Sequence, residues 1–534
     1  MKHLVRVIPA LLSFALAGPS ALAAEQLLLR IKQQNSGSQS SYSLIHAEAG
    51  SFAGKPQAST TSQSDIVLIG RDASGHELFR SRVRNPAVLH AEAFDPASGQ
   101  IAHAQDVLLP QAYFEASLPD HPALDHIELQ SPQLGNERMQ ALRTPQRFER
   151  QTLDRALKEG RMRALATTAV TSTVLYESGP SANRMDIVLI GDGYTSAEMA
   201  KWASDAQKVA NGLLADPLFA AHKSGLNIRR VDIASNQSGV DEPLKGQTRD
   251  TALGMVVGCY NIDRLVCADE NLVYAAVGQV TAADARDVIV AIANTTTYGG
   301  AGGEIATMTM HASAIELALH EIGHTAFALA DEYDYGTCNN SVEPSQANAT
   351  RQTSRASIKW GSLIAASTTV PTPLNTFPVG TVGLFTGAKY CTSGLYRPTQ
   401  DSRMRTLGKP WYAVNEQRAN VVFSSYSGSG GDTNPPVTAT GTLAAGAVAN
   451  LPSGSYLTSN QGGNFQIQLS GPANADFDLA LYRWNGSAWV SVATAAGPSS
   501  GETLNYAASA GYYYIEVKAY SGSGSYTAVY TAPK

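Results

Sequence analysis

Long hydrophobic runs are almost absent from this sequence of 534 residues. No stretch after residue 25 is long and apolar enough to span a bilayer, which takes about 20 apolar residues. The apolar run at residues 7–17 is also too short, but Lys2 and Arg6 precede it and an A-x-A site, residues 21–23, follows it. This is the pattern of a secretory signal peptide. We therefore expect residues 1–24 to be removed on export and the mature chain to be secreted, with no membrane span.

Charged residues are also scarce, and basic residues do not predominate. Asp, Glu, Lys and Arg make up 16% of the chain, with 39 Lys and Arg against 45 Asp and Glu. Removal of the signal peptide takes away Lys2 and Arg6 and no acid, so the formal charge moves from -6 to -8. An acidic chain is poorly suited to the phosphate backbone of a nucleic acid. We expect no nucleic-acid partner.

Cysteine is rare, and its spacing excludes a cysteine-based zinc cluster. No two of the four cysteines form a C-x-x-C motif. An even number in an exported chain favours disulfides, of which three pairings are possible. We predict the pairs Cys259–Cys267 and Cys338–Cys391, with four free thiols as the alternative.

The chain is too long for one core, and its composition divides it into several regions. Residues 25–135 read as strands separated by turn residues, as in an all-β sandwich. Residues 136–169 are strongly basic with an imperfect helical stripe, which predicts a solvated helical linker or a pro-segment. Residues 428–439 form a Gly/Ser/Pro linker, and residues 440–534 again read as an all-β sandwich.

Residues 170–427 have the pattern of a mixed α/β domain. Buried strands are predicted at residues 185–190 and 287–293, and another strand at 304–310. A helix is predicted over residues 197–213, because Thr195 or Ser196, with Glu198 soon after, can cap it.

The motif that carries chemistry is HExxH, which begins at His320. Residues four apart lie on one side of a helix, so His320 and His324 can direct both imidazoles at one metal ion. Glu321 is rotated by about 100° and stands beside the ion, where it can act as a general base. Zn²⁺ suits these ligands and lowers the pKa of bound water to about 7. The alternative for the bare motif is a helix with two surface histidines.

Two neighbouring features support a metal site on this helix. Ser313 and Glu316 form an S-x-x-E capping box just before the motif. Asp331, seven residues after His324, can supply the third ligand, with Glu332 as the competitor. His311 is expected to be a hydrogen-bonded loop histidine. We expect the helix to end near Ala330, within about two residues.

The stretch from His320 to Tyr333, HEIGHTAFALADEY, resembles the bacterial IgA-specific metallopeptidase family, whose motif is a HExxH helix ending in DEY. The similarity covers about residues 170–425. The family looks metzincin-like, and Met404 matches the methionine that metzincins place beneath the metal. The sequence departs from metzincins at Phe327, where they have glycine, and at Ala330, where they have a third histidine.

The C-terminal segment resembles a second family. Residues 440–534 are similar to the bacterial pre-peptidase C-terminal domain, through segments such as residues 476–482 and 511–515. Such domains accompany secreted bacterial peptidases. This resemblance is independent of the HExxH motif and implies the same function.

Together these observations predict a multidomain protein, in which a metzincin-like α/β zincin domain is flanked by two all-β sandwich domains. We expect a secreted bacterial zinc metalloendopeptidase, monomeric, that acts on protein or peptide substrates. His320, His324 and Asp331 would bind Zn²⁺ and Glu321 would be the base, while the strand at residues 304–310 would pair with extended substrate. The alternatives are a secreted adhesin-type binding protein with a vestigial zinc site and a metal-dependent hydrolase of a non-peptide bond.

Overall fold

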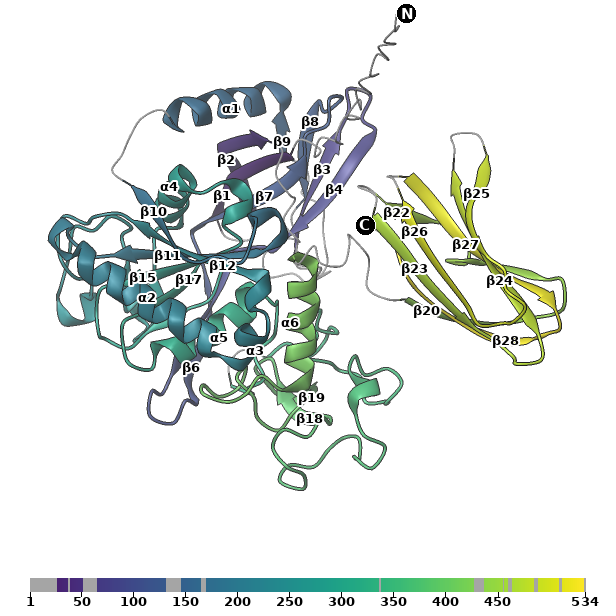
Figure 1. Ribbon diagram of the computed structural model, residues 1–534. Helices are drawn as coiled ribbons and strands as arrows, with labels where there is room; N and C mark the ends of the chain where they lie inside the picture. Colours follow the sequence, from purple (N-terminus) through teal and green to yellow (C-terminus); the bar gives the residue numbers. More distant parts are fainter. Residues whose placement is uncertain are drawn as a thin grey trace, which may run out of the picture.

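The computed structural model shows an N-terminal region of sheets, a mixed α/β central region and a C-terminal sandwich (Figure 1). It describes residues 26–36, 39–50, 65–130, 146–164, 170–335, 338–426, 437–454, 456–459, 463–484, 488–508 and 511–532. The expected signal peptide lies outside the described residues, as does most of the Gly/Ser/Pro linker.

Two antiparallel sheets share one core in the N-terminal region. Their strand orders are β2-β1-β7 and β4-β3-β8-β9. Alternate residues of β7, from Ala112 to Leu118, face the core, where Leu29 and Ile127 of the two sheets also lie. The strands are β1 (Gln26–Ser36), β2 (Gln39–Gly50), β3 (Ile66–Arg71), β4 (Glu77–Val83), β7 (Gln111–Pro119), β8 (His126–Gln130) and β9 (Gln146–Glu149).

The described part of the expected linker is packed on these sheets. Strand β9 and helix α1 (Arg150–Ala164) fall within residues 136–169. Phe148, Leu153 and Leu157 are buried in the N-terminal core. The prediction of a solvated linker is therefore wrong for residues 146–164, because the apolar stripe covers the core instead of facing water.

One hairpin leaves the N-terminal sheets. Strands β5 (Val88–Phe94) and β6 (Ile101–Leu108) pair with each other in a separate two-stranded sheet. Figure 1 shows β6 extending away from the other N-terminal strands and along the central region. At the turn, the Leu407 amide donates a hydrogen bond of 2.8 Å to the Gly99 carbonyl. The hairpin is thus held by the central region as well as by its own chain.

The central region is built on a six-stranded sheet with the order β10-β12-β11-β15-β17-β16. Its inner strands β12, β11, β15 and β17 are parallel to one another, and β10 and β16 are antiparallel edges. The three predicted strands are confirmed as β11, β15 and β17. The bounds are β10 (Thr171–Tyr176), β11 (Met185–Asp192), β12 (Leu226–Asp232), β15 (Val288–Ala293), β16 (Gly300–Ala301) and β17 (Ala306–Thr309).

Helices cover both faces of this sheet. Met185, Ile187 and Leu189 of β11 pack against one layer of helices, formed by α2, α5 and α6. Val188 and Ile190 face the other side, against α4. The helices are α2 (Met199–Ala215), α3 (Pro217–Ala221), α4 (Glu270–Val280), α5 (Ala314–Thr325) and α6 (Tyr412–Tyr426). The predicted capping box between Thr195 and Glu198 is confirmed, and it opens a 3-10 turn, Ser196–Glu198, that leads into α2.

The strand expected to pair with substrate is not an edge strand. β17 is hydrogen-bonded to β15 on one side and to β16 on the other. An extended peptide cannot add to a strand whose two sides are already occupied. The outermost strand of the sheet on this side is β16, and a bridge between its Gly300 and Leu265 occupies part of the outer side.

Both predicted disulfides are confirmed. Cys259 is bonded to Cys267 and Cys338 to Cys391, so no cysteine is free. The first closes a small loop that begins just after strand β13 (Val256–Val257) and ends with its partner strand β14 (Val266–Cys267). The second ties the segment after α5 to the hairpin of β18 (Phe385–Ala388) and β19 (Cys391–Arg397).

The C-terminal region is a β-sandwich. Its sheets have the orders β20-β28-β23-β26 and β21-β27-β24-β25, with β22 paired to β27, and they enclose one core. The strands are β20 (Val437–Leu443), β21 (Val448–Leu451), β22 (Leu457–Ser459), β23 (Gly463–Ser470), β24 (Asp476–Trp484), β25 (Trp489–Ala495), β26 (Glu502–Ala508), β27 (Gly511–Ser521) and β28 (Gly524–Thr531). Among the described residues, none of the helices has the length and apolar character needed to cross a membrane.

Candidate metal centre

Helix α5 presents the HExxH motif from a buried position. Its apolar residues, such as Leu319 and Ile322, pack into the core beneath the sheet. Gly323 lies on Met404: a Cβ added to this glycine would be 2.6 Å from the Met404 sulfur. The side chain of Met404 therefore lies directly against the turn of helix between the two histidines.

The start of α5 differs from the prediction. Ser313 is the N-cap residue, but its side chain makes no capping hydrogen bond. Glu316 forms an ion pair with Arg403 and does not reach back to the helix start. The Ser313 amide instead donates to His311 Nδ1 over 3.1 Å, which gives His311 the loop role expected of it. The predicted capping box does not form, because a tertiary ion pair takes its glutamate.

The predicted end of α5 is also wrong. The helix ends at Thr325 and not near Ala330. Ala328 has a left-handed backbone with φ of 50°, and the Leu329 amide bonds to the Gly323 carbonyl over 3.1 Å. This turn reverses the chain early. It brings the Leu329 carbonyl and then Asp331 back to the histidines.

The two imidazoles are held with their Nε2 atoms facing each other. His320 Nδ1 is 2.9 Å from the Arg403 carbonyl oxygen, and His324 Nδ1 is 2.8 Å from the Leu329 carbonyl oxygen. Because a carbonyl only accepts, each Nδ1 must carry its proton. The Nε2 atoms are 3.1 Å apart. In the neutral rings they present two lone pairs to the same point, which is the tautomer and orientation of metal-binding histidines.

Asp331 joins this pair, whereas Glu332 does not. Asp331 Oδ1 lies 3.2 Å from His324 Nε2 and 3.4 Å from His320 Nε2. Its Oδ2 accepts a hydrogen bond of 2.7 Å from the Tyr390 hydroxyl. Glu332 is buried elsewhere and accepts hydrogen bonds from side chains of Asn348, Asn415 and Ser402.

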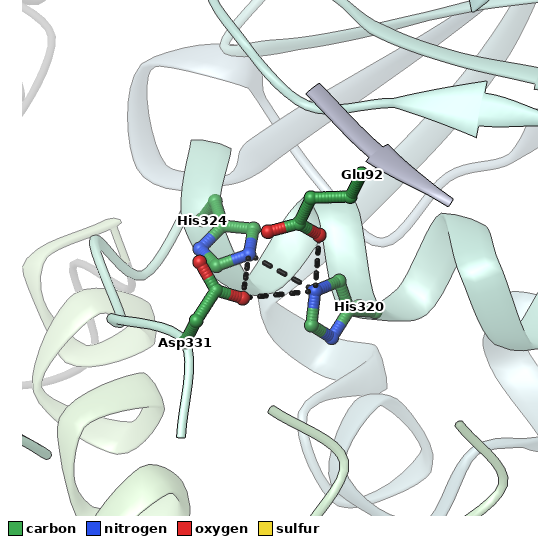
Figure 2. A group of neighbouring side chains, drawn as sticks. All are labelled: Glu92, His320, His324 and Asp331. Carbon is green, nitrogen blue, oxygen red and sulfur yellow. Dashed lines mark hydrogen bonds and ion pairs between the residues drawn. The ribbon is translucent and has the colours of Figure 1, made fainter. Parts of the chain in front are cut away.

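A fourth residue, Glu92 of β5, lies in the same cluster. Figure 2 shows the four side chains converging, with Glu92 on a strand and the two histidines on helix α5. Its Oε2 is 3.1 Å from His320 Nε2, and its Oε1 accepts a hydrogen bond of 2.5 Å from the Tyr333 hydroxyl. Sequence analysis missed Glu92. It precedes His320 by 228 residues, and no local motif marks it.

Burial and charge act strongly on this cluster. Burial alone would lower the pKa of His324, but the Asp331 carboxylate raises it to about 9. Burial would also lower the pKa of His320, but Asp331 and Glu92 hold this pKa well above its usual range. Burial would raise the pKa of Asp331, yet the two imidazoles hold it well below its usual range. In the absence of metal, the cluster thus retains protons that a divalent cation would replace.

The donor set fits zinc. Two imidazole nitrogens and carboxylate oxygens are zinc ligands, whereas calcium and magnesium prefer oxygen alone. Asp331 Oδ1 is buried and has no hydrogen-bond partner among the described residues. All four candidate ligand atoms lie within 4.8 Å of one another. An orphaned carboxylate oxygen between two Nε2 atoms is the environment that a bound cation would satisfy.

Glu321 stands next to the cluster without joining it. Burial, reinforced by the neighbouring Glu92 carboxylate, raises the pKa of Glu321 to about 7. Its Oε1 has no hydrogen-bond partner among the described residues. Its Oε2 faces Gly302, where an added Cβ would lie only 2.5 Å away. The glycine loop thus leaves this carboxylate the room that a side chain would take.

Two histidines and an aspartate that can hold a metal, with a buried glutamate beside them, are the arrangement of a metallopeptidase site. The comparisons with protein families lead to the same class. Residues 173–379 match the family IgA Peptidase M64, and residues 455–519 match the Bacterial pre-peptidase C-terminal domain. The chain therefore carries a domain of a peptidase family together with a domain typical of secreted bacterial proteases.

Solved structures resemble only part of the chain. The Yersinia pseudotuberculosis-derived mitogen is 21% identical, with 18% of this chain and 86% of that chain covered and a TM-score of 0.16. The pre-peptidase C-terminal domain of a collagenase from Bacillus anthracis is 19% identical, covers 18% and 87%, and has a TM-score of 0.16. Likenesses of this size carry no argument about function.

Proposed function

We propose that this protein is a secreted zinc metalloendopeptidase, with residues 170–427 as a metzincin-like catalytic domain. In this proposal His320, His324 and Asp331 hold the zinc ion and Glu321 is the general base. A zinc ion bound there would supply Lewis-acid chemistry, lowering the pKa of water to about 7 and polarising a substrate carbonyl. The mature chain would act outside the cytoplasm as a monomer on protein or peptide substrates.

One observation carries the proposal: the orientation of the two imidazole rings, each with Nδ1 against a backbone carbonyl. Both Nδ1–H groups are committed to backbone carbonyls, so both Nε2 atoms are directed at Asp331 Oδ1. A pair of surface histidines has no reason to be fixed in this way. The position of Met404 against Gly323 supports the metzincin-like assignment.

The chain's own groups account for the proton transfers of peptide hydrolysis. Glu321 Oε1 is unpaired and can accept the proton of an attacking water. Burial raises its pKa to about 7, so the same carboxyl can return that proton to the departing amine near neutral pH. The carbonyls of Arg403 and Leu329 fix the ring orientations, and the Tyr390 hydroxyl fixes Asp331.

The test is Glu321→Gln in the mature chain, assayed on casein with and without a chelator. Glutamine keeps the volume but cannot accept the proton, so hydrolysis should fall by a factor of about 100 to 10,000 while zinc content stays unchanged. Glu77→Gln, an exposed position on β4, is the matched control because it removes the same charge outside the metal cluster.

Each rival function gives a different result in the same assay. If the protein is a binding protein with a vestigial site, neither wild type nor Glu321→Gln would cleave casein. A hydrolase of another bond would hold zinc but cleave no protein. Casein cleavage that survives Glu321→Gln would refute the proposed base.

A further inference from the structure

The cluster around His320 contains one protein ligand too many for a catalytic site. Catalytic zinc sites use three protein ligands and keep one position open, whereas four protein ligands make a closed, structural site. Glu92 Oε2 is as close to His320 Nε2, at 3.1 Å, as the second histidine is. Glu321 is a base that needs an open position beside it. A site closed by Glu92 and a site open beside Glu321 would therefore be two different states of the same centre.

The segment that carries Glu92 is seated firmly in the centre. The Phe94 ring packs edge-on against the His320 ring with centroids 4.8 Å apart, and the Phe94 carbonyl accepts a bond of 2.9 Å from Arg264. Glu92 and Phe94 are both buried. At the hairpin turn, Gly99 and Gln100 are joined to the segment after Met404 by the hydrogen bond to Leu407 and a β-bridge to Thr406.

The same hairpin packs beside β16, the outermost strand on this side of the central sheet, in which Gly300 is already bridged to Leu265. Ala91 of β5 packs in one apolar cluster with Ala301 of the edge strand β16. The Arg84 guanidinium, just before β5, donates 2.9 Å to the carbonyl of His324. Metallopeptidases take extended substrates, and an edge strand is where such a segment can add by main-chain pairing. The hairpin lies beside Ala301, the residue of β16 that is not bridged to Leu265, and so limits the access of a substrate segment to this strand.

We propose that the hairpin β5–β6 holds the peptidase latent, with Glu92 as a fourth metal ligand in place of water. The proposal rests on the proposed function, because it assumes that the cluster binds zinc. Activation requires the hairpin to leave, which frees the fourth position and uncovers Ala301 of β16, so only the open fraction of the mature chain cleaves casein. The inhibitory element is thus the β5–β6 hairpin, whereas β9 and α1, the described part of the basic segment, pack on the N-terminal core.

The inference is tested in the mature chain loaded with Co²⁺, whose visible absorption reports its ligands. Acetohydroxamate, a small metal-chelating probe, is titrated into wild type and Glu92→Gln. In wild type the probe binds only the fraction of molecules with the hairpin displaced, which weakens its apparent affinity. A minor open state of about 0.1–10% makes the wild-type affinity about 10- to 1000-fold weaker than that of Glu92→Gln.

A second variant and a control separate closure from misfolding. A Cβ at Gly99 would lie 2.7 Å from the Leu407 carbonyl oxygen, so Gly99→Ala loosens the hairpin without touching the carboxylate. It should tighten probe binding in the same direction as Glu92→Gln. Glu77→Gln should bind the probe like wild type. Zinc affinity should fall by at least about ten-fold in Glu92→Gln, since even the loss of an outer-shell partner has that effect.

The outcomes distinguish this inference from the proposed function. Equal probe affinity in wild type, Glu92→Gln and Gly99→Ala would overturn the inference, even if casein is cleaved. Tighter probe binding in both variants supports closure, even if neither variant cleaves casein, in which case only the proposed function fails. Failure of wild type to bind cobalt would overturn both.

Discussion

Asp331 and Glu332 are adjacent carboxylates, and we expect their substitutions to have different effects. Substitution of Asp331 should lower the affinity for zinc, and substitution of Glu332 should lower the stability of the fold. Asp331 has one oxygen between the two Nε2 atoms and the other on the Tyr390 hydroxyl. Asp331→Asn keeps the shape but replaces the charged carboxylate that we propose as a zinc ligand with a neutral amide. We expect zinc affinity to fall by at least about ten-fold, or about 1.4 kcal/mol, which is the lower bound set by the loss of an outer-shell partner.

The Glu332 side chain should instead contribute to the stability of the folded chain. Its oxygens accept hydrogen bonds from Asn348, Asn415 and Ser402, and all three partners donate. In Glu332→Gln the new amide nitrogen replaces one of these acceptor oxygens, so it either leaves an asparagine donor without its acceptor or forces the Ser402 hydroxyl to accept instead of donate. The free energy of unfolding should fall by about 1–3 kcal/mol. Zinc affinity should change little, because the side chain lies outside the ligand cluster.

The two variants are compared by chelator competition for zinc and by urea unfolding of the metal-free chain. Metal-free protein is used for the second measurement because a ligand that binds only the folded state adds its own stabilisation. A Glu332→Gln variant that loses zinc while Asp331→Asn keeps it would reverse the assignment. If both variants keep zinc, the ligand set itself is refuted.

Two further predictions concern the base and the protons of the cluster. Gly302→Ala places a Cβ 2.5 Å from Glu321 Oε2 and should displace the base, lowering the rate of peptide hydrolysis about 100-fold at unchanged zinc content. Gly225→Ala, where a Cβ meets nothing within 4 Å, is its control, and an equal loss in both would contradict the argument. Zinc binding at pH 7 should release protons, because Asp331 outweighs burial and raises the pKa of His324 to about 9 in the metal-free cluster. The release should decline as the pH rises through 9, and calorimetry in buffers of different ionisation enthalpy would show a buffer-independent signal if the reasoning is wrong.

Local patterns in the sequence predicted those structural features that are determined by residues close together in the chain. His320 and His324 lie on one side of a helix because their spacing matches the helical repeat, and the strand at residues 185–190 follows from its continuous apolar run. The even count in a chain expected to be exported predicted two disulfides, and the small loop between Cys259 and Cys267 favoured the pairing that is observed. In each case the information lies within the pattern itself.

Contacts between distant segments decided the rest. Glu316 was expected to cap α5, but Arg403, far along the chain, takes it. The helix ends five residues early because Ala328 adopts a left-handed turn that no residue preference at that position predicts. Glu92 enters from a strand of the N-terminal region, and only the folded chain shows that this carboxylate meets the histidines.

The order of the chain places the blocking carboxylate ahead of the centre it blocks. Glu92 is synthesised 228 residues before His320 and emerges first during translation. N-terminal segments generally fold first as a chain emerges. The residues of the hairpin have therefore been made before the HExxH helix, although its contacts with Thr406 and Leu407 form only after that helix has been synthesised. No stage of synthesis yields the HExxH helix before the segment that carries Glu92, so the proposed cover and the centre it closes are encoded in one chain in that order.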